Sequence, residues 1–101
     1  MRAGELAGGT VTYEVWKYPV FISDEFSLSM PIGSKLLSVQ TQFGKPQLWA
    51  LVNPDVPKTD RRFRLAGSGH PIDPKWSDGY VGTWQDLGGS FVWHLFAEVE
   101  S

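Results

Sequence analysis

Short runs in which apolar and polar residues alternate are the feature that most limits how this chain can fold. Phe26, Leu28 and Met30 alternate with serines, and Pro31 stops the run. A period of two residues is typical of a β-strand that buries one face. Nowhere do apolar residues recur at the spacing of a helix longer than about two turns. The sequence therefore predicts an all-β protein.

About seven such strands are expected, joined by turns rich in glycine and proline. The segment 47–52 is apolar on both faces, which favours a central strand. A chain of 101 residues suits one domain. We expect a small antiparallel β-sandwich or partly open barrel over residues 11–101, after a disordered, glycine-rich tail over residues 1–10. The expected strands cover residues 11–19, 26–30, 36–43, 47–52, 61–66, 80–85 and 91–99.

Composition restricts the classes of function. The chain has no cysteine, which excludes disulfides, thiolate nucleophiles and zinc sites built on sulfur. A formal net charge of -2 disfavours binding to the phosphate backbone of duplex DNA. The sequence shows no apolar run typical of a signal peptide and none of the roughly eighteen residues that would suit a membrane span. We expect a cytoplasmic protein that does not bind membranes.

A cluster of arginines precedes a glycine turn. Arg62 and Arg64 lie two residues apart on an expected strand, so they share a face and are separated by roughly 6.6 Å along it. Guanidinium groups suit bidentate contacts with phosphate. The backbone amides of Gly67, Ser68 and Gly69 are candidates for an anion-binding nest. A solvated strand face and an ordinary glycine turn explain the same residues, and both interpretations stay open.

The chain has two histidines, His70 and His94. Neither has a carboxylate or a second histidine at a metal-ligand spacing, so we predict no metal site. We also predict no catalytic residues, because the sequence identifies no catalytic partner for either ring. His70 lies in the glycine turn and is a candidate ligand contact. His94 lies in a strand between aromatic residues and is expected to be half-buried with one hydrogen bond.

Five tryptophans are many for a chain of this length. Trp49 and Trp93 are expected in the core. Trp16, Trp76 and Trp84 are candidates for stacking on a ligand or a protein partner. Because the aromatic supply exceeds what a core of this size buries, we also expect a homo-oligomer.

Glutamines at strand positions form a third set of candidates. Gln40 and Gln42 share one face of an expected strand, and Gln85 lies in another. In a pocket, their paired donors and acceptors would be able to read the edge of a nucleobase. On a solvated face they would have no such role, and that is the commoner case.

Several short motifs are distinctive in their order and spacing. They are WKYP at 16–19, Met30-Pro31, Gln40 with Gln42, LWALV at 48–52, G-x-GHPI at 67–72, YVGT-x-Q at 80–85 and HLF at 94–96. Together they resemble a family of short phage and prophage proteins of unknown function. The resemblance implies a phage-encoded protein in the cytoplasm of the bacterial host, and it assigns no catalytic residues. Ser68 stands where the family more usually has threonine, which keeps the hydroxyl.

Small cytoplasmic phage proteins of this kind often act by binding, and some sequester the nucleotide second messengers of bacterial immunity. The resemblance therefore implies an anti-defence sponge that works without catalysis, cofactor or metal. Its expected ligand is phosphorylated and nucleotide-like, for example a cyclic dinucleotide or a cyclic ADP-ribose derivative. The alternative is a protein-binding module that inhibits a host enzyme or serves in phage assembly. Binding of single-stranded nucleic acid is disfavoured by the overall acidity.

Overall fold

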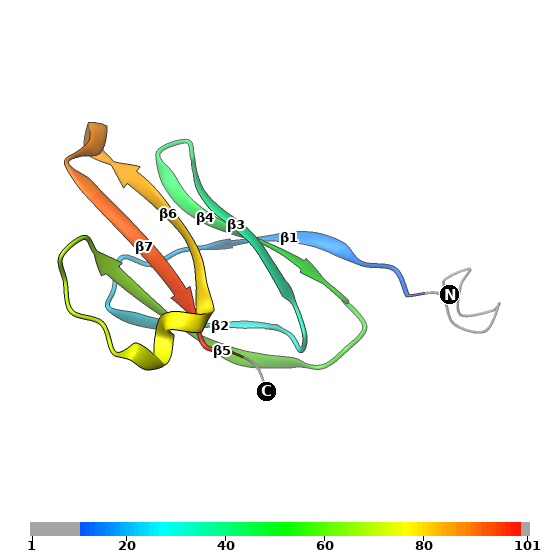
Figure 1. The fold of residues 1–101 in the computed structure, drawn as a ribbon. Helices are drawn as coiled ribbons and strands as arrows, with labels where there is room; N and C mark the ends of the chain where they lie inside the picture. Colours follow the sequence, from blue (N-terminus) through cyan, green and yellow to red (C-terminus); the bar gives the residue numbers. More distant parts are fainter. Residues whose placement is uncertain (1–10, 100–101) are drawn as a thin grey trace.

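The computed structural model describes residues 11–99, and its regular elements are strands apart from two short 3-10 segments (Figure 1). The all-β prediction is therefore confirmed. The tail expected over residues 1–10 lies outside the described residues. Within 11–99, neither helical segment is long and apolar enough to cross a membrane. The elements are β1 (Glu14–Pro19), β2 (Glu25–Pro31), β3 (Lys35–Gln42), β4 (Lys45–Val52), β5 (Lys58–Gly67), η1 (Pro74–Gly79), β6 (Tyr80–Asp86), η2 (Leu87–Gly89) and β7 (Phe91–Ala97).

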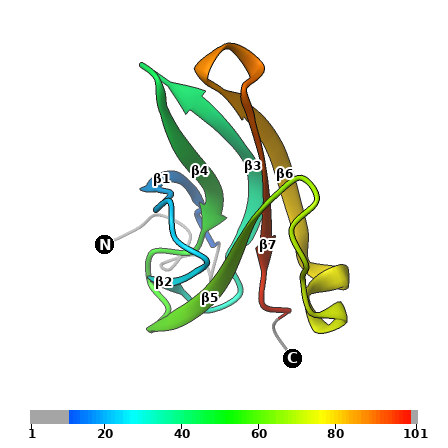
Figure 2. The same cartoon turned by 90° about the vertical axis from the view of Figure 1, so that its left-hand side faces the viewer.

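The strands form two antiparallel sheets that pack as a small sandwich (Figure 1 and Figure 2). The small sheet has the strand order β1-β4-β3, and the large sheet has the order β2-β5-β7-β6. β4 has a partner on both sides, which confirms the central position expected for residues 47–52. β3 and β6 are edge strands of different sheets, and they contact each other along one side of the sandwich (Figure 2).

The core lies between the sheets and follows the two-residue period of the strands. Leu48, Ala50 and Val52 of β4 are fully buried, whereas the residues between them are partly exposed on the outer face. Phe63 of β5 and Leu95 of β7 are fully buried in the large sheet. Burying one large apolar side chain stabilises a fold by about 1.5–3 kcal/mol, so this interior is the main source of stability.

Two glycines allow close approaches of the backbone. A Cβ on Gly82 of β6 would lie 2.7 Å from Cγ1 of Val39 in β3. A Cβ on Gly79, at the end of η1, would lie 1.7 Å from the carbonyl oxygen of Ala97 in β7. The missing side chains therefore let the two sheets meet at β3 and β6, and let the end of η1 lie against β7.

Candidate functional site

The first predicted site is the arginine cluster of β5. Arg62 extends from the outer face of the large sheet, where its guanidinium forms an ion pair with Glu25 of β2. The two side chains are 53% and 46% exposed. An exposed ion pair stabilises a fold by at most about 1 kcal/mol. Arg62 is therefore accessible, but its charge already has a partner.

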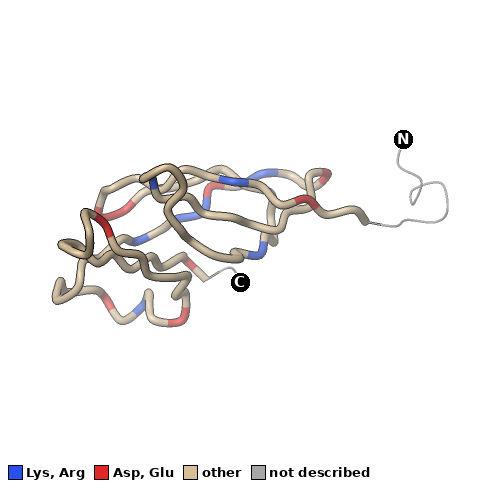
Figure 3. The backbone as a smooth tube through the Cα atoms, turned by 90° about the horizontal axis from the view of Figure 1, so that it is seen from above, with Lys and Arg blue, Asp and Glu red and all other residues tan. Residues whose placement is uncertain are grey.

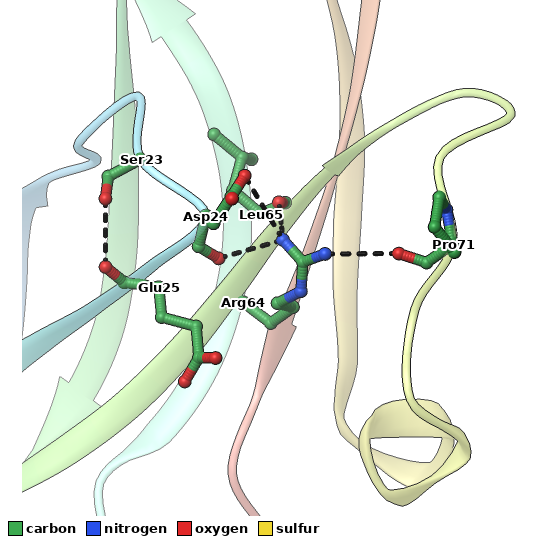
Figure 4. Close-up of polar contacts among 6 residues, drawn as sticks. All are labelled: Ser23, Asp24, Glu25, Arg64, Leu65 and Pro71. Carbon is green, nitrogen blue, oxygen red and sulfur yellow. Dashed lines mark hydrogen bonds and ion pairs between the residues drawn. The ribbon is translucent and has the colours of Figure 1, made fainter.

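Arg64 is far less accessible, with a side chain that is 16% exposed. Its guanidinium donates to the carbonyl oxygens of Asp24, Leu65 and Pro71 at 3.1, 2.6 and 3.1 Å (Figure 4). The carboxylate of Asp24 lies 3.6 Å from the same guanidinium. Arg64 thus ties the segment before β2 to the turn after β5, and its donors are engaged by the fold itself.

These contacts predict different consequences for the two arginines. Replacing Arg64 with methionine should lower the free energy of unfolding by about 2 kcal/mol, because main-chain carbonyls lose a charged donor. The same change at Arg62 should lower it by no more than about 1 kcal/mol. Urea unfolding followed by tryptophan fluorescence measures both. Equal, small losses would contradict the structural role of Arg64.

The glycine turn after β5 is also engaged by the fold. The amide of Ser68 donates to the carbonyl of Val92 at 3.1 Å, and the amide of His70 donates to the carbonyl of Gly67 at 3.0 Å. Gly69 has a φ of +86°, in the left-handed region that favours glycine. The His70 ring lies so close to Gly67 that a Cβ there would be 3.1 Å from it. Of the three amides expected in the anion nest, that of Ser68 is therefore engaged by β7.

The tryptophans are placed differently from the prediction. Trp76 and Trp84 are only 4% and 6% exposed. The prediction that their rings are accessible for stacking on a ligand or partner is therefore wrong. Trp84 belongs to the core between the sheets, and Trp76 is buried within η1. Trp49, expected in the core, lies on the outer face of the small sheet, while Trp93 packs against the core but stays partly exposed. Trp16 is partly exposed, with a lysine ammonium 5.5 Å from its ring centroid.

The glutamines do not converge on one pocket. Gln40 and Gln42 share the outer face of the small sheet, which agrees with the two-residue period of β3. Gln42 accepts a hydrogen bond of 2.8 Å from the ammonium of Lys17 in β1. Gln85 belongs to β6 of the large sheet. The predicted site residues therefore form several separate groups.

A different set of residues surrounds a cavity where the two sheets meet. The cavity has a volume of about 400 Å³ and lies between the start of β3, the start of β6 and the end of β7. Arg61 contributes to it from β5, and donates to the carbonyls of Ser34 and Glu98 at 2.9 and 3.3 Å. Those contacts fix the direction of the guanidinium. The cavity is further lined by Lys35, Leu36, Asp78, Tyr80, Val81 and Val99.

Two cationic side chains and Tyr80 line the cavity. Lys35 is exposed and Arg61 is half-buried. Tyr80 is 56% exposed, and its ring packs edge-on against Phe96 with the ring centroids 5.5 Å apart. Asp78 adds a carboxylate, and aliphatic side chains form the remaining wall. This arrangement suits a small ligand that carries an anionic group next to a flat or apolar one.

Charges elsewhere are mixed in sign. Figure 3 shows basic and acidic residues interspersed along the backbone of the described range. Within residues 11–99, histidines and carboxylates nowhere gather in the groups of three or more that would hold a metal ion. The cavity thus brings two positive charges, those of Lys35 and Arg61, close together in a molecule whose charges are otherwise mixed.

A family model described as Domain of unknown function (DUF7352) matches residues 12–101. The chain belongs to this family. The match spans all the strands of both sheets, the arginine cluster and the cavity. No curated protein and no solved structure matches the chain.

Sequence reasoning about this DUF7352 chain missed Lys35 and Tyr80. Lys35 follows a glycine turn and resembles any lysine at the start of a strand. Only the contact between β3 and β6 brings it near Tyr80. The position of Arg61 could have been predicted, because the two-residue period places it on the opposite face of the strand from Arg62 and Arg64.

Proposed function

We propose that this DUF7352 protein is phage-encoded and captures a small, phosphorylated, nucleotide-like ligand in the cavity between the sheets. In the host cytoplasm it would act as a sponge for a second messenger of bacterial immunity. The observation that carries the proposal is the placement of Lys35 and Arg61 together in one cavity that Tyr80 also lines. The volume of about 400 Å³ falls in the usual range of small-molecule sites. The phage origin rests on the resemblance of the motifs.

Each side chain of the cavity has a matching group on such a ligand. Lys35 and Arg61 would donate charge-assisted hydrogen bonds to phosphate oxygens. Arg61 is already held by two carbonyl oxygens, so little side-chain freedom is lost on binding. The aliphatic wall of the cavity would contact a base, and Asp78 would accept hydrogen bonds from a ribose hydroxyl or an amino group. No bond needs to be broken for this role.

The proposal includes a homo-oligomer. Val11, Tyr13 and Val15 follow one another at two-residue spacing in and before β1, and they are 58%, 58% and 56% exposed. β1 pairs only with β4 among the described strands, so its other edge is open. A row of exposed apolar side chains on an open edge strand favours pairing with a second copy.

Calorimetric titration with cyclic dinucleotides, cyclic ADP-ribose and ADP-ribose tests the proposal. At least one of these should bind. Replacing Lys35 with glutamine should weaken that binding by about tenfold or more, because a charge-assisted hydrogen bond is worth about 1.5–3 kcal/mol. Lys45→Gln is the matched control, since Lys45 is an exposed lysine at the start of β4 and does not line the cavity.

Two outcomes would count against this site. Absence of heat with every ligand would contradict the capture of nucleotide-like molecules. Loss of binding in Arg62→Gln, with full binding in Lys35→Gln, would move the ligand to the outer face of β5. That result would restore the anion site predicted from the sequence.

One observation favours the alternative of a protein-binding module. Phe43 lies at the tip of the hairpin between β3 and β4 with a φ of +51°, and it is 97% exposed. Fully exposed aromatic rings are unfavourable in water and frequently anchor protein partners. A host enzyme or a phage assembly protein would then cover this tip. Phe43→Ala is the appropriate negative control for capture of such a partner from a host lysate.

A further inference from the structure

Four side chains form a hydrogen-bonded chain across the outer face of the large sheet. Oγ of Ser68 lies 2.8 Å from Nε2 of His94, and Oγ1 of Thr83 lies 2.9 Å from Nδ1 of the same ring. The hydroxyl of Tyr80 lies 2.6 Å from Oγ1 of Thr83. His94 therefore has a partner on each ring nitrogen, whereas the sequence led us to expect one hydrogen bond.

The fold holds this chain in place from two sides. Thr83 of β6 lies directly opposite His94 of β7 in the antiparallel ladder. The turn that carries Ser68 is attached to the same strand, because the amide of Ser68 donates to the carbonyl of Val92. The hydroxyl of Ser68 is thus positioned beside the imidazole by main-chain contacts.

We propose that Ser68 is a nucleophile, activated by His94, that accepts an acyl group from a small activated ester. A hydroxyl within hydrogen-bond reach of a base, which is itself oriented by a third group, is the arrangement of activated serine nucleophiles. When Nδ1–H donates to Thr83, the lone pair of Nε2 faces the hydroxyl of Ser68. Ser68 is exposed, so a reagent can reach it.

A cavity of about 240 Å³ lies beside the turn that carries Ser68, and its aromatic walls extend from the face of β7 opposite His94. It is lined by Ser68 and His70 on one side, and by Phe91, Val92 and Trp93 on the other. The rings of Phe91 and Trp93 stack with centroids 6.0 Å apart and an angle of 18° between their planes.

The reaction needs no further reagent than water. Oγ of Ser68 bonds to the carbonyl carbon while its proton passes to Nε2 of His94. The bond to the ester's alkoxy oxygen then breaks, and that oxygen takes the proton from Nε2. Water attacks the acyl-serine with His94 again as the base, which releases the acid and restores Ser68. The amide of Gly69 has no hydrogen bond within residues 11–99 and lies beside the nucleophile in sequence, where it can donate to the oxyanion.

Thr83 is the positioning residue of this site. A hydroxyl orients the imidazole, but it stabilises the imidazolium less than the carboxylate of a serine hydrolase does. We therefore expect acylation by activated esters and slow turnover.

The test uses p-nitrophenyl acetate and a fluorophosphonate probe, with release of p-nitrophenolate, intact mass and peptide mapping as readouts. The expected result is one modification per chain at Ser68. Ser68→Ala should lose it, and His94→Gln should slow it at least about a hundredfold. Thr83→Val should slow the reaction, and Thr83→Ser should restore it. Ser90→Ala removes the other serine of the same cavity and should change nothing.

Circular dichroism of each variant separates loss of reactivity from loss of the fold. If His94→Gln fails to fold, the comparison of Thr83→Val with Thr83→Ser still tests the role of the imidazole. The proposal is overturned if neither reagent modifies Ser68. It is equally overturned if Ser68 reacts at the same rate in folded His94→Gln, or in Thr83→Val when His94→Gln is unfolded.

Discussion

Replacing Phe63 with alanine should lower the free energy of unfolding by about 3–5 kcal/mol. Phe63 is fully buried in β5, and its ring stacks on Phe26 of β2 with the centroids 5.3 Å apart. The change removes a ring that β5 contributes to the core. The surrounding strands cannot close the resulting space without losing their register. Urea unfolding followed by circular dichroism measures the loss.

Phe43 provides a matched control, since Phe43→Ala removes the same atoms from a site that is 97% exposed. Surface substitutions of this kind usually change stability by less than about 0.5 kcal/mol. Similar losses for the two variants would mean that β5 does not lie in the core as described.

Replacing Gly79 with alanine should lower the free energy of unfolding by about 3 kcal/mol. Overpacking a close contact typically costs 1–3 kcal/mol, and this contact is at the severe end. The added Cβ would lie 1.7 Å from the carbonyl oxygen of Ala97, and main chain cannot rotate away as a side chain can. Thermal unfolding checks the value, with Ser77→Ala as the control because Ser77 is exposed in the same short helix. An unchanged melting temperature for Gly79→Ala would show that η1 does not lie against β7.

Local pattern predicted the strands well because each strand carries its own period. Leu28 and Met30 of β2, like Leu48 and Ala50 of β4, are buried at alternate positions as the sequence indicates. The start of β5 was missed: residues 53–59 contain two prolines and suggest a loop, yet β5 begins at Lys58. That residue pairs with Pro31 of β2, and such a long-range partner leaves no local signal.

The candidate sites were harder to predict because their partners come from distant segments. The two-residue period correctly placed Arg62 and Arg64 on one face of β5. It could not show that Glu25 of β2 and Asp24, just before that strand, lie against them. Trp76 was expected to be exposed because it lies in a segment with Pro71 and Pro74 that suggests a loop, but the short helix that contains it buries its ring. The hydrogen bond between Ser68 and His94 likewise depends on the register of β5 with β7.

The strand order of the two sheets also determines how the chain must find its fold. The β3–β4 and β6–β7 pairs are hairpins between consecutive strands, so they can form early from nearby residues. β1 with β4 and β2 with β5 instead join residues as far apart as Glu14 and Val52, or Glu25 and Arg64. The β2–β5 pairing closes a loop around the β3–β4 hairpin, and the β1–β4 pairing closes a loop that contains β2 and β3. The entropy of each closure is lost before the contacts repay it. β1 and β2 are therefore the strands that lack a local partner in the folding chain, and both remain exposed to other chains until β4 and β5 pair with them.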